Sequence, residues 1–116
     1  MTAGIVSYNL LIMELVVKSI HLTARDGENE DFDPKRGNTD VIISLNDGKQ
    51  YIASFFSYAN IEEMRIEHQI DGTFLHGSYF WGKTMILVEE RSMQSIESVV
   101  NDIIDEGNFL EAFRQL

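Results

Sequence analysis

The sequence predicts an α+β domain in which two main helices pack on one face of a mostly antiparallel sheet of about four to five strands, in the order β-β-β-α-β-α. Two observations carry this prediction. Residues 41–56 place β-branched and aromatic residues on both sides of an Asn-Asp-Gly turn, which is typical of a β-hairpin. Apolar residues recur at helical spacing over residues 93–104, which is typical of a helix that buries one stripe.

The turn of the hairpin predicts its register. A two-residue loop at Asp47 and Gly48 mixes apolar and polar side chains on both faces, whereas a three-residue loop over 46–48 separates them, with Gly48 in a left-handed conformation. We expect the longer loop, because burial of an apolar face fixes the register. One face then carries Val41, Ile43, Leu45, Tyr51, Ala53 and Phe55. The other face carries Ile42, Ser44, Gln50, Ile52 and Ser54.

The remaining strands and the long loop are predicted from local patterns. Residues 14–23 are β-branched and partly alternating, so they predict a strand that pairs with residues 41–45. Residues 25–39 contain the only proline and have no periodicity, so they predict a loop. We expect a short strand at 78–81 and a firmer one at 84–90, whose apolar run indicates a central position in the sheet.

Capping residues predict the limits of the two main helices. Asn60 is followed three residues later by Glu63, which is the spacing of a capping box, and Gly72 can end this helix in a left-handed conformation. Ser92 is the expected N-cap of the last main helix, and Gly107 its end. The apolar stripe of that helix, which we expect to cover the sheet, consists of Met93, Ile96, Val99, Val100, Ile103 and Ile104.

A short helix is predicted at the end of the sequence. Asn108 is its expected cap, with Glu111 at the position of a capping box. Its apolar residues face inward or toward a partner, and they are Phe109, Leu110, Phe113 and Leu116. Together with residues 1–12, this tail offers a surface for a two-fold homodimer.

The composition limits the classes of function. The length predicts one domain over residues 13–116. The apolar residues 1–12 resemble neither a signal peptide nor a membrane span, so we expect them to be an N-terminal extension, with Met13 as the native start. Nineteen acidic against nine basic residues give a formal charge of −10, which disfavours nucleic-acid and membrane partners and attracts a basic protein. The absence of cysteine excludes disulfides and thiolate chemistry, and it suits the cytoplasm.

The candidate catalytic and metal-ligating residues form no motif in the sequence. His21, His68 and His76 belong to different predicted elements and lack the spacing of metal ligands. The acidic loop does not match a calcium-binding EF-hand loop, because Asp31 stands where glycine is needed and Gly37 where the last acid is needed. We therefore expect no enzyme, no catalytic residue, no metal and no cofactor. The alternative is a pocket for a small ligand or a reaction, assembled by the fold around His68 and His76.

An aromatic group near residue 80 has two interpretations. It consists of Phe74, Tyr79, Phe80 and Trp81. Packing in the core is the first interpretation, and a patch for a partner protein is the second, because Tyr and Trp are frequent anchors of interfaces. Trp81 precedes Gly82 at the end of the expected strand, which favours the second interpretation.

Four segments show a resemblance to known proteins. They are the run over 40–62 that begins Asp-Val-Ile-Ile-Ser-Leu-Asn-Asp-Gly, Tyr-Phe-Trp over 79–81, Met-Ile-Leu-Val-Glu-Glu over 85–90, and Ile-Ile-Asp-Glu-Gly-Asn-Phe over 103–109. With these segments the chain resembles a group of small acidic bacterial proteins without assigned activity, and proteins of this size and charge are often immunity proteins encoded beside secreted toxins. The resemblance implies a bacterial cytosolic origin and a binding role, and it identifies no functional residue.

The sequence therefore favours a binding protein that neutralises a basic partner such as a toxin. The expected contact residues are the acids of the loop together with two aromatic anchors: Asp26, Glu28, Glu30, Asp31, Asp33, Tyr79 and Trp81. A homo-oligomeric protein is a further alternative.

Overall fold

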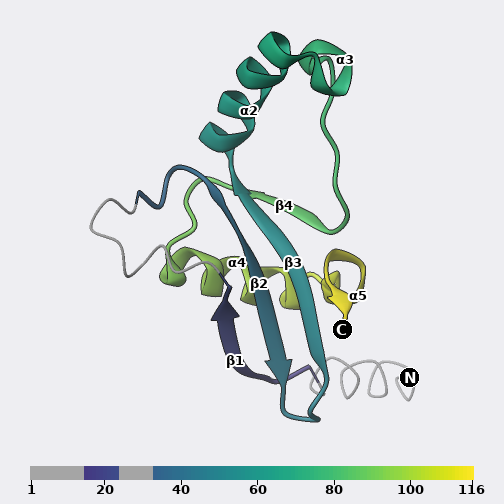
Figure 1. Cartoon of the computed structure of the whole chain (residues 1–116). Helices are drawn as coiled ribbons and strands as arrows, with labels where there is room; N and C mark the ends of the chain where they lie inside the picture. The colour runs from purple at the N-terminus through teal and green to yellow at the C-terminus, as the bar shows by residue number, and fades with distance from the viewer. Residues whose placement is uncertain (1–14, 24–32) are drawn as a thin grey trace.

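The computed structural model describes residues 15–23 and 33–116 (Figure 1). A five-stranded sheet has the order β1-β2-β3-β4, and β5 pairs with β3 beside β4. The strands are β1 Val17–Leu22, β2 Asn38–Leu45, β3 Gln50–Ser57, β4 Met85–Val88 and β5 Arg114–Gln115. The helical elements are α2 Tyr58–Asp71, α3 Thr73–Gly77, α4 Met93–Asp105 and α5 Phe109–Ala112. The predicted α+β class is confirmed.

Most of the sheet is antiparallel, as the sequence predicts. β1 pairs with β2, β2 with β3 and β5 with β3 in antiparallel fashion, whereas β4 runs parallel to β3. A parallel pair needs a long crossover, because the chain must return to the end of the sheet from which it started. α2, α3 and the segment that follows them supply this crossover.

The expected register of the hairpin is confirmed. Ile43 lies opposite Tyr51, and Gly48 has a φ of +89° in a three-residue loop that is closed by the bond from the Leu45 N–H to the Lys49 carbonyl at 2.9 Å. The predicted apolar face is buried throughout, with every one of its side chains at most 6% exposed. β1 extends this face, because Ile20 lies opposite Ile43.

One helix and the tail cover this face. α4 begins at Ser92, whose side chain accepts a hydrogen bond from the Ser95 N–H at 3.2 Å, as predicted. Its stripe packs on the sheet through the buried residues Ile96, Val100 and Ile104. Figure 1 shows α4 crossing one face of the sheet, with α5 beside β3. The core therefore lies between the hairpin and the C-terminal quarter of the chain.

The tail closes the core with two aromatic rings. Phe109 packs edge-on against Tyr51 at 5.1 Å between ring centroids and stacks on Phe113 at 4.7 Å. Phe113 in turn lies 6.2 Å from Phe55. Leu110 remains exposed, so only part of the predicted apolar set faces inward. Asn108 makes no capping bond through its side chain, so the predicted capping box does not form.

Three predictions about the middle of the chain differ from the structure. The sequence predicts that two main helices pack on one face of the sheet. α2, however, has no buried residue and extends away from the sheet, so α4 is the main helix that packs on this face. Residues 78–81 form no strand, because the preceding turn directs them back along α2. β4 is an edge strand rather than a central one, since β3 is its only partner strand in the described part of the chain.

A buried arginine that sequence reasoning missed joins the loop before β2 to the start of α4. Arg91 is 6% exposed, its Nε donates to the Arg36 carbonyl at 2.5 Å, and its backbone N–H donates to the Pro34 carbonyl at 2.7 Å. A side chain on Gly37 would come within 2.6 Å of the guanidinium. Arg91 thus fixes the turn from which β2 begins.

Replacement of Phe109 by alanine tests the role of the aromatic closure. Phe109 is fully buried between Tyr51 and Phe113, so we expect F109A to lower the free energy of unfolding by about 3–5 kcal/mol. The matched control is L110A, on the neighbouring residue, whose side chain is 64% exposed, with an expected change within about 0.5 kcal/mol. Urea denaturation followed by circular dichroism measures both. Equal losses would mean that the tail does not close the core.

Candidate functional site

The crossover forms an arm that projects from the sheet. We define the arm as residues 58–83, which comprise α2, α3 and the segment that returns to β4 (Figure 1). It leaves the sheet at the end of β3 and rejoins it at the start of β4. Because it lies beyond the core, local interactions hold the arm together, and most of its surface remains accessible.

α2 starts one turn earlier than the sequence predicts. Ser57, rather than Asn60, is the N-cap, and its hydroxyl accepts the hydrogen bond from the Asn60 N–H at 3.0 Å. Ser57 is fully buried at the end of β3, so its burial places the base of the helix on the sheet. The predicted end is confirmed, because Gly72 has a φ of +86° and its N–H bonds the His68 carbonyl at 2.9 Å.

A left-handed turn reverses the chain at the tip of the arm. Phe74, Leu75 and His76 have φ values of +51°, +52° and +56°, and Gly77 follows at +76°. Each residue with a side chain costs about 1–2 kcal/mol in this conformation, so the turn needs compensating contacts. A side chain on Gly77 would lie 2.6 Å from the Arg65 carbonyl, which shows how closely the returning chain approaches α2.

A cluster of five aromatic rings supplies these contacts, formed by Phe56, His68, Phe74, Tyr79 and Phe80. Phe74 lies 5.0 Å from His68, 5.3 Å from Tyr79 and 5.1 Å from Phe80, measured between ring centroids. Phe80 also packs edge-on against Phe56 of β3 at 5.7 Å. The cluster therefore links α2, the left-handed turn and the sheet. This assigns Phe74 and Phe80 to packing, which was the first of the two interpretations drawn from the sequence.

The other two aromatic residues of the group, Tyr79 and Trp81, are at least half exposed, although the ring of Tyr79 also contacts Phe74. They belong to a set of six exposed large hydrophobic side chains on the arm, against five elsewhere in the described chain. The six, with their exposed fractions, are Tyr58 54%, Ile66 48%, Ile70 82%, Leu75 71%, Tyr79 50% and Trp81 62%. Such a concentration on one projecting element is typical of an interaction surface. The sequence pattern of α2 offered no signal for the outward position of Ile70, because a buried helix has the same spacing.

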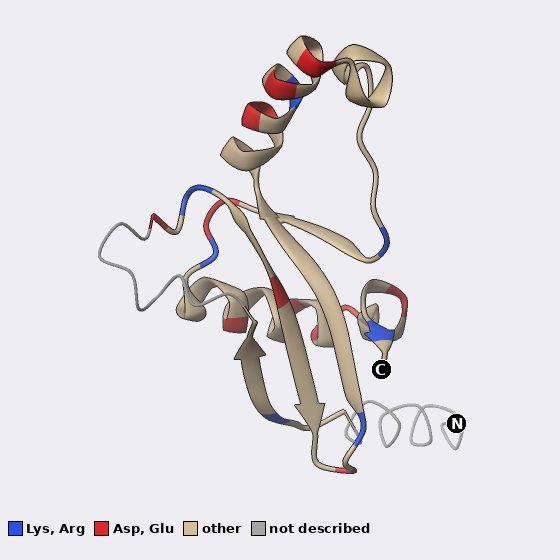
Figure 2. Ribbon diagram, in the orientation of Figure 1, with Lys and Arg blue, Asp and Glu red and all other residues tan. Residues whose placement is uncertain are grey.

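Carboxylates lie beside some of these hydrophobic side chains on α2. Glu67 and Asp71 directly follow Ile66 and Ile70, so an acidic stripe runs beside an apolar stripe along α2. The Thr73 side chain and N–H donate to the carboxyl of Asp71 and lower its pKa. Within the described ranges, Glu67 lies in no ion pair. Figure 2 shows the acidic residues of α2 along its length.

Two ion pairs organise the base of the arm. Arg65 binds Glu62 one turn earlier on the same helix, and this contact lowers the pKa of Glu62 and raises that of Arg65. Arg36 binds Glu63 across to the turn before β2, and the hydrogen bond raises the pKa of Arg36. Both basic side chains are thus already matched by acids, and they do not offset the charge of Glu67 or Asp71.

A second acidic surface lies on the C-terminal segment. Its exposed carboxylates are Glu89, Glu97, Asp102, Asp105, Glu106 and Glu111. None of them forms an ion pair with any residue that the structure describes. Asp102, Asp105 and Glu106 also lie at the C-terminal end of α4, where the helix dipole disfavours negative charge. Figure 2 shows acidic residues along α4 and on the tail.

Two cavities flank β4. The smaller has a volume of about 240 Å³ and is lined by His68, Tyr79, Phe80 and neighbouring residues of the arm. The Nδ1 atom of His68 is buried and has no hydrogen-bond partner in the described part of the chain. His76 does not line this cavity and is exposed, so the structure does not bring the two histidines of the alternative prediction into one pocket.

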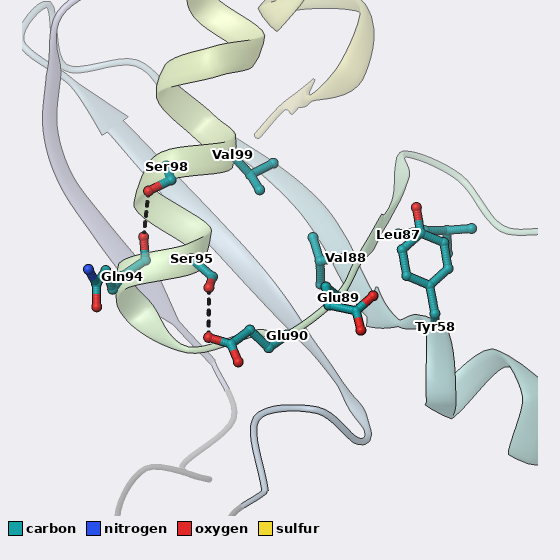
Figure 3. A pocket seen from close by; sticks show the side chains of 9 residues that line it. All are labelled: Tyr58, Leu87, Val88, Glu89, Glu90, Gln94, Ser95, Ser98 and Val99. Atoms are coloured by element: carbon teal, nitrogen blue, oxygen red, sulfur yellow. Dashed lines mark hydrogen bonds between the residues drawn. The ribbon is translucent and has the colours of Figure 1, made fainter.

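The larger cavity is an open hollow of about 530 Å³ between the start of α2 and the start of α4 (Figure 3). Glu90 lies at the rim of this hollow, and its carboxylate accepts hydrogen bonds from the hydroxyls of Ser95 at 3.0 Å and Ser92 at 3.2 Å. These bonds serve the cap of α4. In the described ranges, no group of three or more His, Asp or Glu side chains has the arrangement of a metal site.

The predicted contact residues are placed as follows. Asp26, Glu28, Glu30 and Asp31 lie outside the described residues, as do residues 1–12. Asp33 is exposed, and its side chain accepts the Lys35 N–H at 3.0 Å, so it shapes the turn before β2. Tyr79 and Trp81 lie on the arm. The structure thus adds Ile66, Ile70, Leu75, Glu67 and Asp71 to the candidate surface.

Comparisons with protein-family models, with curated proteins and with solved structures found no match to this chain. In the residues that the structure describes, no helix is both long enough and apolar enough to cross a membrane. The surface of the arm is therefore the feature from which a function can be proposed.

The close approach at the tip of the arm can be tested with two glycines. We expect G77A to lower the melting temperature more than G48A, because Gly77 combines a positive φ with a clash against the Arg65 carbonyl. Gly48 has an even more positive φ of +89° but open space around its Cα, so G48A reports the conformational cost alone, about 1 kcal/mol. Differential scanning calorimetry measures both. A smaller effect in G77A than in G48A would contradict the geometry of the tip.

Proposed function

We propose that this protein is a non-enzymatic binding protein that holds a basic partner protein on its arm. The observation that carries the proposal is the set of six exposed hydrophobic side chains on an element outside the core. Exposure of Ile70 and Leu75 does nothing for the stability of the isolated chain, whereas burial of such side chains in an interface is worth about 1.5–3 kcal/mol each. Tyr79 and Trp81 add the aromatic character typical of interface anchors.

Charge supports a basic partner over a neutral or acidic one. The arm has four acidic and two basic residues, and the chain as a whole has a formal charge of −10. Lysine and arginine side chains of a partner would meet Glu67 and Asp71 beside the apolar stripe. Complementary charge of this kind accelerates association and excludes acidic competitors. The unpaired acids of α4 strengthen the same field from a distance.

An immunity or inhibitor protein that neutralises a basic toxin is the particular form of this function that we propose. The resemblance of the sequence to small acidic bacterial proteins supports it, together with a surface suited to bind rather than to react. A projecting, acidic and partly apolar arm can enter the groove of a protein whose substrate is itself anionic. The partner's basic residues would then be occupied in the way its substrate occupies them.

Site-specific photo-crosslinking tests this proposal. A photoreactive phenylalanine analogue at Ile70 is expected to give an adduct with a basic protein in the native host, because this side chain is 82% exposed on the arm. The same analogue at Leu110, which is 64% exposed but lies on the tail, is the control and should give no such adduct. Mass spectrometry identifies the adducts. Identical adducts at both positions, or adducts with acidic proteins only, would contradict the proposal.

The affinity for the identified partner then measures the contribution of the arm. We expect I70D and W81A each to raise the Kd at least tenfold, which is the size of effect seen when a central anchor of an interface is removed. Raising the salt concentration should weaken binding of the wild-type chain, because part of the attraction is between exposed charges. Isothermal titration calorimetry provides both measurements. Retention of full affinity in both variants would exclude the arm from the interface.

A further inference from the structure

The outer edge of β4 has no backbone partner among the residues that the structure describes. β4 bonds to β3 on its other side, where the Ser54 N–H donates to the Thr84 carbonyl at 3.0 Å. In a parallel ladder, alternate residues of a strand direct their N–H and C=O groups to the same side. Thr84, Ile86 and Val88 thus face β3, whereas Met85 and Leu87 present theirs at the open edge.

The two edges of the sheet differ in how they are protected. β1, at the opposite edge, carries Lys18 and a register irregularity between Val17 and Ser19. A charged residue and a bulge are both devices that prevent pairing with another chain. β4 has the sequence Met-Ile-Leu-Val, with no charge and no proline, and its pairing with β3 shows no irregularity. Only its length of four residues limits it as a template for another strand.

The charges at the ends of β4 are complementary to themselves. Lys83 precedes the strand, and Glu89 and Glu90 follow it. Neither Lys83 nor Glu89 forms an ion pair within the described parts of the chain. If two copies of this strand pair in antiparallel orientation, each Lys83 lies at the end where the other copy has its glutamates. Parallel pairing would instead place like charges together.

We propose that β4 pairs with β4 of a second copy of this chain, in antiparallel orientation, and joins the two sheets across a two-fold axis. The direction of the backbone groups limits the register. Residues that bond across an antiparallel pair must both direct their backbone to the open edge, and among the registers that satisfy this rule, the one with Met85 opposite Leu87 of the second copy also brings Lys83 opposite Glu89. Ile86 then lies opposite its own copy at the axis, and Lys83 opposite Glu89.

The side chains of β4 agree with this pairing. Leu87 is 41% exposed and lines both of the cavities beside β4, so apolar surface is available on this strand. Opposite residues of an antiparallel pair share a face of the sheet, and the Met85–Leu87 contacts repeat on both sides of the axis. Each contact made by one copy is made again by the other, which is the property of a closed two-fold interface.

Charge reversal at the two ends tests both the interface and its orientation. In wild-type protein we expect a dimer by sedimentation equilibrium at micromolar concentration. K83E and E89K each replace the attraction at both ends with repulsion, and each should raise the dimer Kd about tenfold. The double variant K83E/E89K exchanges the charges and should restore the wild-type Kd. An equimolar mixture of K83E and E89K should form a heterodimer, because both of its ends again join opposite charges.

Three results would overturn the proposal. The first is a wild-type chain that remains monomeric at protein concentrations up to about a hundred times the micromolar range in which we expect the dimer, since the edge of β4 would then be unpaired in solution. The second is a double variant that dimerises no better than either single variant, because the charges would not face each other. The third is an intact dimer in L87K, which places a charge on an exposed side chain of the proposed interface, together with dissociation of the dimer in L110K. This result would show that the tail, and not β4, forms the interface.

Discussion

Burial of the alternating apolar face of the β2–β3 hairpin is the interaction on which the rest of the structure depends. The face is continuous only in the register with the three-residue loop, so its burial selects that register over the shorter one. α4 and the tail cover this face, and Phe109 closes it against Tyr51. Because β1 pairs with β2 in the same sheet, its residues that face the core extend it, and they need no additional helix to cover them.

The arm depends on the core only at its two ends. Ser57 is buried where α2 begins, and Phe80 packs on Phe56 where the arm returns. Between these points α2 buries no side chain, so its cap, the Glu62–Arg65 pair and the aromatic cluster hold it. A parallel β3–β4 pair requires a crossover, but most crossover helices pack on the sheet. Here the crossover projects, and this places apolar side chains where a partner protein can reach them.

Negative charge is arranged in a way that does not favour the stability of the isolated chain. The acids at the end of α4 lie at the unfavourable end of the helix dipole and lack basic neighbours in the described residues. Glu67 and Asp71 lie beside exposed isoleucines. The basic side chains of a partner protein would supply the positive charges that these acids lack in the isolated chain. The edge of β4 lies next to the arm, because Tyr79 of the arm and Leu87 of β4 line the same cavity.

Local patterns determined much of the fold. Alternation in the hairpin, the spacing of apolar residues in α4, and the caps at Ser92 and Gly72 predict their elements, because each depends on residues close together in the chain. The cap at Ser57 was missed because Asn60 has an equally good local pattern, and only the end of β3 decides between them. Four of the five predicted loop acids, Asp26, Glu28, Glu30 and Asp31, lie outside the described residues, whereas Asp33 shapes the turn before β2, and Tyr79 and Trp81 lie on the candidate surface.

Only the tertiary structure decided the position of α2, the left-handed turn and the status of β4. Helical periodicity indicates that α2 has an apolar and a polar face. Burial of the apolar face depends on where the sheet lies, and α2 points away from the sheet. A run of four apolar residues suits both a central strand and an edge strand, because the neighbours of β4 come from distant parts of the chain. The turn at Phe74 needs rings from α2 and from the returning segment. The sequence by itself thus determined the core and its register, and three-dimensional packing decided which apolar residues remained outside it.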